Sequence, residues 1–192
     1  GNGDCTLRAA IEEANAYPGY NIIFFDIPGE GPHYIQPNSE LPAVEDPVDI
    51  NGRSEPDYAY SPVISIQGSN TGGTGGLSFT YDASFSRIIG VNVSGFEGGG
   101  IYLMGNGQSI ILCYIGTDVA GSSSQGNAVG VEILGTYNRL NANVISGNSG
   151  PGVSLFAIPE EDIECHHNVL RSNNIGTDAT GSFAVPNDGD GI

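Results

Sequence analysis

The residues best suited to chemistry lie in one short stretch near the C-terminal end of the chain. His166, His167 and Arg171 follow the acidic run 160–164, which contains Glu161. A lyase acting on uronate sugars needs a cation to neutralise the substrate carboxylate and a base, often Lys or Arg, to remove a proton. A glycoside hydrolase needs two carboxyl groups at a defined separation. Arg171, His166, His167 and Glu161 are therefore the candidate catalytic residues if the chain is a polysaccharide lyase or a glycoside hydrolase.

The same residues also have a simpler interpretation as surface groups. Four close carboxyl groups inside an inserted loop usually form a solvated loop tip. Adjacent histidines on a strand point to opposite faces, so we expect only one of His166 and His167 to face a ligand. The chain has no lysine, and its five basic residues are all arginine. We therefore expect no catalytic residues, and keep the carbohydrate-active enzyme as the alternative.

Aspartates in glycine-rich segments are candidates for calcium ligands, since oxygen-rich loops suit this hard cation. The candidates are two pairs of aspartates. Asp118 and Asp178 each end an Ile-Gly-Thr-Asp sequence, and Asp188 and Asp190 lie in the segment Asn-Asp-Gly-Asp-Gly. Recurrence at equivalent corners favours a structural role, and Asp-Gly pairs are also common in tight turns. We expect that no cofactor is required, with calcium as the one candidate.

The Ile-Gly-Thr-Asp sequences belong to a repeat that extends from Gly98 to Ile192. A glycine precedes an aliphatic residue at spacings of 24, 30, 22 and 39 residues. The glycines of this series are Gly76, Gly100, Gly130, Gly152 and Gly191. A repeat of about 22 residues with short β-branched runs and no helical period predicts an all-β, right-handed parallel β-helix, or solenoid. The longer spacings then contain inserted loops at 119–127, 156–164 and 179–188.

Cys113, Asn143 and Asn173 fall at one corner of this repeat. Asparagine tolerates left-handed backbone and can form hydrogen bonds along a stack. We therefore expect an asparagine ladder, with Cys113 as a small apolar substitute.

The chain is expected to be one domain, 1–192, with a helical cap at 1–19, irregular coils at 20–97 and regular coils at 98–192. The helix is expected over Asp4–Asn15, because Leu7, Ala10, Ile11 and Ala14 form one apolar stripe. Thr6 or Asp4 would cap this helix. It would cover the open end of the solenoid and block edge pairing. We also predict that Asn21–Ile27 is a buried strand.

The segment Gly3–Asn15, GDCTLRAAIEEAN, resembles the signature of the CSLREA family. The Ile-Gly-Thr-Asp-x-x-Gly sequences and Asn143–Asn148 resemble the repeats that usually follow that signature. The resemblance implies right-handed parallel β-helix repeats within a large secreted or surface protein. Ala9 stands where the family usually has Glu, so a capping box with Thr6 is lost here.

The net charge is −17, from 5 basic and 22 acidic residues. Such a surface repels nucleic acids and anionic membranes, and no segment is long and apolar enough to span a bilayer. Cys5, Cys113 and Cys165 allow at most one disulfide, whose identity stays open.

These features predict a noncatalytic structural or adhesin-like module at the cell surface or outside the cell, and a fragment of a longer protein. Its expected partners are polysaccharides, other surface proteins, or further copies joined end to end through the bare C-terminal coil. A third hypothesis is a calcium-stabilised glycan-binding module.

Overall fold

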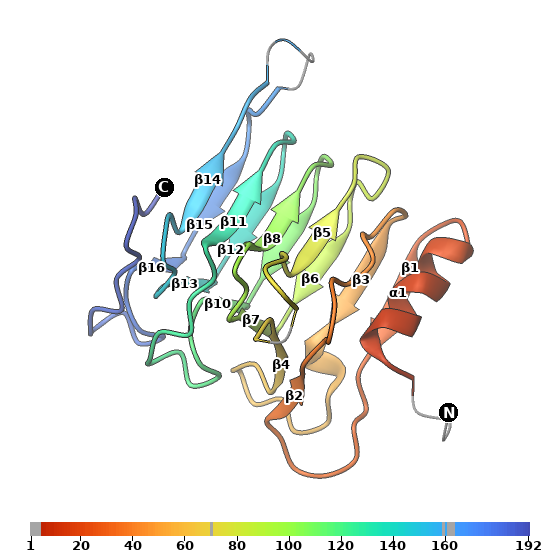
Figure 1. Ribbon diagram of the computed structural model, residues 1–192, viewed down its shortest axis with the longest axis horizontal. Helices are drawn as coiled ribbons and strands as arrows, with labels where there is room; N and C mark the ends of the chain where they lie inside the picture. The colour runs from red at the N-terminus through yellow and green to blue at the C-terminus, as the bar shows by residue number, and fades with distance from the viewer. Residues whose placement is uncertain (1–4, 70, 159, 161–163) are drawn as a thin grey trace.

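The computed structural model describes residues 5–69, 71–158, 160 and 164–192. These residues form a mostly β structure with one α-helix and parallel sheets. The chain passes through three sheets in turn, and each passage, here called a coil, places its strands beside those of the previous coil (Figure 1). The repeated polar and aliphatic segments of the sequence are thereby stacked along one axis.

The strands of each sheet follow one another in chain order. The first sheet contains β1 (Asn21–Phe24), β3 (Val48–Asn51), β6 (Arg87–Ile89), β9 (Ser109–Ile111), β12 (Arg139–Asn141) and β15 (Val169–Arg171). The second contains β2 (His33–Ile35), β4 (Ile64–Gln67), β7 (Val91–Ser94), β10 (Tyr114–Ile115), β13 (Val144–Ile145) and β16 (Asn174–Ile175). The third contains β5 (Leu77–Phe79), β8 (Gly99–Leu103), β11 (Val129–Ile133) and β14 (Val153–Leu155). A short 3₁₀ turn, Gly52–Ser54, follows β3.

Aliphatic side chains fill the space between the sheets and stack in register. In the third sheet, Leu77, Ile101, Val131 and Val153 form one row, each no more than 2% exposed. This row confirms the register predicted from the glycine–aliphatic series. The preceding glycine is required where coils approach closely, since a Cβ at Gly130 would lie 2.3 Å from the carbonyl oxygen of Gly152.

A corner separates the strand of the first sheet from the strand of the second sheet in successive coils. Gly90 separates β6 from β7 and Leu112 separates β9 from β10, with φ of 67° and 55°. The left-handed backbone at these positions turns the chain from the first sheet to the second. Each coil therefore has three faces.

The predicted asparagine ladder lies just after this corner. Asn143 Oδ1 accepts the backbone N–H of Cys113 at 2.9 Å, and Asn173 Oδ1 accepts that of Asn143 at 3.0 Å. This confirms the row, with buried Cys113 at its end. The left-handed residues, however, are Leu112, Ala142 and Ser172. The asparagines supply the side-chain bonds, and the residues before them make the turn.

A second ladder, which the sequence did not reveal, lies between the second and third sheets. Asn148 Oδ1 accepts the N–H of Asn127 at 3.1 Å, and Asn187 Oδ1 accepts that of Asn148 at 3.0 Å. These pairs are 21 and 39 residues apart. Loops of different length separate them, and this hides the repeat in the sequence.

The helix α1 (Leu7–Ala16) lies at one end of the stack, beside β1 (Figure 1). Leu7, Ile11 and Ala14 are buried in the hydrophobic core, as the apolar stripe predicted. Thr6 caps the helix, since its Oγ1 accepts the N–H of Ala9 at 3.2 Å. The helix thus begins at Leu7, while Asp4 lies outside the described residues.

Asn21–Ile27 is only partly a buried strand, and that prediction was wrong for its outward face. The strand β1 ends at Phe24, and Ile22 and Phe24 are 48% and 65% exposed. Ile23 and Phe25 are buried, because alternate side chains of a strand point to opposite faces. Within the described residues no helix has both the length and the apolar character needed to cross a membrane.

Candidate functional site

The loops that connect the third sheet to the first lie side by side along one edge of the stack (Figure 1). Among the described residues, each loop contains one with left-handed backbone. Backbone hydrogen bonds join successive loops: Phe85 to Asn106 at 2.8 Å, Gly107 to Thr136 at 2.9 Å, and Tyr137 to His166 at 3.2 Å. The left-handed residues are Phe85, Gly107, Tyr137 and His167, with φ of 67°, 66°, 59° and 56°. The same turn is therefore stacked in successive coils. We call it the aromatic corner.

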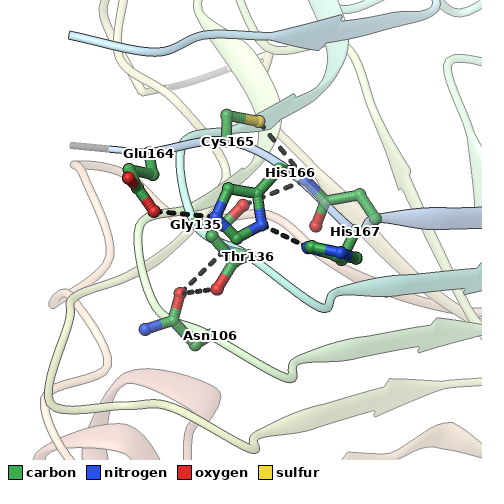
Figure 2. A network of polar contacts seen from close by, with 8 residues as sticks. Asn106, Gly135, Thr136, Glu164, Cys165, His166 and His167 are labelled. Carbon is green, nitrogen blue, oxygen red and sulfur yellow. Dashed lines mark hydrogen bonds and ion pairs between the residues drawn. The ribbon is translucent and has the colours of Figure 1, made fainter. Parts of the chain in front are cut away.

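The two histidines of the sequence lie side by side at this corner. The ring of His167 stacks on Tyr137 with 4.9 Å between centroids and 6° between planes. His166 lies edge-on to His167, and its Nε2 is 2.7 Å from Glu164 Oε2 (Figure 2). The Nδ1 atoms of the two histidines lie within hydrogen-bond distance of each other.

The expectation that the two histidines would point to opposite faces was wrong. It assumed a strand, whereas both residues lie in the turn before β15. The left-handed backbone of His167 brings its ring back beside that of His166. Both side chains are exposed, so the pair is available to a ligand.

An open groove of about 440 Å³ is lined in part by Glu164, which contacts His166. Inside it, Asn106 Oδ1 accepts the N–H of Thr136 at 2.7 Å and its hydroxyl at 2.9 Å (Figure 2). The groove thus combines apolar, amide, hydroxyl and carboxylate groups. Its described lining residues are Tyr81, Met104, Asn106, Leu134, Gly135, Thr136 and Glu164. We call it the corner groove.

The described lining residues of the corner groove include one carboxyl group, that of Glu164. Glycoside hydrolysis needs two carboxyl groups. The Cys165 thiol donates to the backbone carbonyl of Ile133 at 3.4 Å, and burial raises its pKa. A thiol in such a setting is a poor nucleophile.

Among the described candidate catalytic residues, Arg171 is not joined to the histidines. Arg171 is exposed at the end of β15, and within the described part of the chain its side chain forms no hydrogen bond or ion pair. Glu161 lies outside the described residues. The residues brought together are therefore His166, His167 and Glu164.

The aspartates of the Ile-Gly-Thr-Asp sequences anchor the loops that follow them. Asp118 Oδ1 accepts the N–H groups of Ser122 at 2.8 Å and Ser123 at 3.2 Å. Asp178 Oδ1 accepts those of Ser182 at 2.9 Å and Phe183 at 3.1 Å. The hydrogen bonds to Asp178 hold the pKa of its carboxyl group below the usual value, and the bond from the Phe183 N–H has the largest effect.

The other calcium candidates, Asp188 and Asp190, are exposed. Their backbone groups bond to neighbouring coils, Asp188 N–H to Asn148 and Asp190 C=O to Gly152, each at 2.9 Å. The described residues do not gather the four aspartates into one group. Calcium binding at Asp118, Asp178, Asp188 and Asp190 stays a prediction.

A second groove, which the sequence did not suggest, lies on the outer face of the third sheet. Tyr102 and Glu132 are paired on β8 and β11, and both line this groove with Glu40. Desolvation raises the pKa of the Glu132 carboxyl. The alternation of inward and outward residues in β11 could have placed Glu132 on this face, but not beside Glu40.

Comparison with known proteins adds one structural likeness. No family model matches the sequence, and no curated protein matches it. Among solved structures, the chain is similar to the Dettilon tailspike protein, with a TM-score of 0.43 and 18% sequence identity over 88% of this chain. The aligned region is 35% of the tailspike chain, so the present chain spans about a third of its length.

Proposed function

We propose that the chain is a right-handed parallel β-helix module of an extracellular or cell-surface protein, with a structural or adhesin-like role, and that it binds glycan in the corner groove without cleaving it. The parallel coils support the first part of this proposal, since each coil presents its corner loop at the same edge. The resemblance of Gly3–Asn15 to the CSLREA signature forms part of this proposal.

The observation that carries glycan binding is the exposed aromatic stack beside a polar groove. Tyr137 is 55% exposed although its ring is large and apolar. Stacked on His167, it presents a ring face and a hydroxyl, which together suit the mixed apolar and polar surface of a sugar. The amide of Asn106 and the hydroxyl of Thr136 supply hydrogen-bonding groups nearby. With a net charge of −17, the protein would favour neutral over acidic glycans.

One observation favours the enzymatic alternative, and it concerns the second groove. A carboxyl group whose pKa is raised by desolvation can act as a general acid, and Glu132 has this character. Glu40 would supply the second carboxyl group. Under this alternative the catalytic pair would be Glu132 and Glu40, in place of Arg171, His166, His167 and Glu161.

The test is retention of the protein on immobilised neutral polysaccharides. Tyr137→Ala is the test variant, and Tyr60→Ala is its matched control. Both positions hold an exposed tyrosine with left-handed backbone, at φ of 59° and 67°. Backbone strain is therefore similar in the two variants. We expect Tyr137→Ala to lose retention and Tyr60→Ala to keep it. Equal retention of the two variants, or no retention of the unmodified protein on any neutral glycan, would overturn the proposal.

A further inference from the structure

A histidine and two carboxylates meet in the irregular first coils, far from the aromatic corner. His33 begins β2, and Glu55 and Asp57 follow the turn Gly52–Ser54. Each residue offers one ligand atom, and these atoms lie within 4.8 Å of one another. The parallel pairing of His33 with Ile64 positions β2 beside the coil that supplies the carboxylates.

The carboxylates are fixed by backbone hydrogen bonds. Glu55, whose side chain is 2% exposed, accepts the N–H of Ile27 at 3.1 and 3.4 Å. Asp57 Oδ2 accepts the N–H of Gly31. The site is therefore preorganised, because both carboxylates are held in place by the preceding coil.

Two polar atoms of the group have no hydrogen-bond partner although they are buried. These are His33 Nε2 and Asp57 Oδ1. The His33 side chain is 11% exposed, and its Nε2 lies 3.7 Å from Glu55 Oε1. Unpaired buried polar atoms cost free energy, and two of them within one cluster of metal-ligating residues indicate a bound group.

We propose that His33, Glu55 and Asp57 bind a divalent transition-metal ion of the Zn²⁺ class through His33 Nε2, a Glu55 oxygen and Asp57 Oδ1. Such an ion provides a partner for both unpaired atoms. Ligands of tetrahedral zinc with bonds of about 2.0–2.1 Å are about 3.3 Å apart. The 3.7 Å between His33 and Glu55, and separations of up to 4.8 Å among the three ligand atoms, would close around the ion.

The type of ligand selects the ion. Imidazole nitrogen favours Zn²⁺ and other late first-row transition-metal ions, whereas Ca²⁺ prefers oxygen ligands alone. Neutral histidine, two carboxylates and Zn²⁺ also sum to zero charge, which suits a partly buried site. The ion would join the loop 27–31 and β2 to the following coil.

The experiment uses the whole 192-residue chain, stripped of metal with a chelator and then titrated with ZnCl₂. We expect one zinc ion per chain and a rise in the thermal midpoint of about 5–10 °C at a hundredfold excess over Kd. His33→Ala and Asp57→Asn should lose this rise. Asp57→Asn is nearly isosteric and keeps an oxygen acceptor for Gly31, so it guards against a variant that fails to fold. The double variant His166→Ala/His167→Ala is the control and should keep the rise.

Cobalt identifies the ligands directly. Co²⁺ bound by one imidazole and carboxylates gives visible bands without a thiolate charge-transfer band, and we expect that spectrum to disappear in Asp57→Asn. A thiolate band, zinc binding that survives in both His33→Ala and Asp57→Asn, or no zinc binding by the unmodified chain would overturn the proposal.

Discussion

Removing one amide from the asparagine ladder should destabilise the protein well beyond an ordinary substitution. Asn143 is 1% exposed. Its Oδ1 accepts the N–H of Cys113, and its Nδ2 donates to the carbonyl of Ile110 and to Asn173 Oδ1, all at 2.9–3.0 Å. Asn143→Ala leaves the backbone groups of Cys113 and Ile110 without these partners.

The size of the effect follows from those two groups. A buried polar group without a partner costs about 1–3 kcal/mol. We expect the free energy of unfolding to fall by about 2–4 kcal/mol. This is less than the largest combined cost of the two unpaired groups, because a water molecule can enter the vacated space and bond to them. The midpoint of urea unfolding, followed by far-ultraviolet circular dichroism, should fall with an unchanged m-value.

Asn141→Ala is the matched control for this measurement. Asn141 lies two positions away on β12, and within the described part of the chain its side chain forms no hydrogen bond. Asn141→Ala should change the free energy of unfolding by no more than about 0.5 kcal/mol. If Asn143→Ala were as mild as Asn141→Ala, the ladder would not be a source of stability and the reasoning would be refuted.

Two further predictions concern titratable groups. Burial raises the pKa of the Cys113 thiol to about 11. Iodoacetamide at about pH 8 should therefore modify exposed Cys5 quickly and leave Cys113 unmodified until the protein unfolds. Peptide mass spectrometry would measure the two rates, and equal rates would contradict this prediction. The pKa of the Asp178 carboxyl is lowered in the folded state, so its stabilising contribution is fully present above about pH 5 and is lost as the pH falls through the folded pKa. The difference in urea midpoint between the unmodified protein and Asp178→Asn should therefore shrink in acid, and a difference that grows in acid would refute this sign.

Local patterns in the sequence predicted much of the architecture. The stripe Leu7, Ile11 and Ala14 predicted the buried face of α1, and the glycine–aliphatic series predicted the register of the third sheet. Both patterns work because the side chains that pack together recur at regular intervals. The first asparagine ladder was predictable for the same reason, since its members are 30 residues apart.

The site was less accessible from the sequence, because corners and long-range neighbours determine it. The left-handed backbone of His167, which brings the two histidines together, has no signature in the residue type. His33 and Glu55 are neighbours only because β2 pairs with β4, and no short motif joins them. The three cysteines, for which one disulfide was an open possibility, form no disulfide in the structure.

The most direct test of the proposed function is incubation of the protein with a panel of neutral and acidic polysaccharides, with calcium present and products read by mass spectrometry. We expect every polysaccharide to stay intact, while neutral ones bind the protein through the aromatic corner. Oligosaccharide products at an enzyme-like rate, abolished by Glu132→Gln in a folded variant, would contradict it and identify the second groove as an active site.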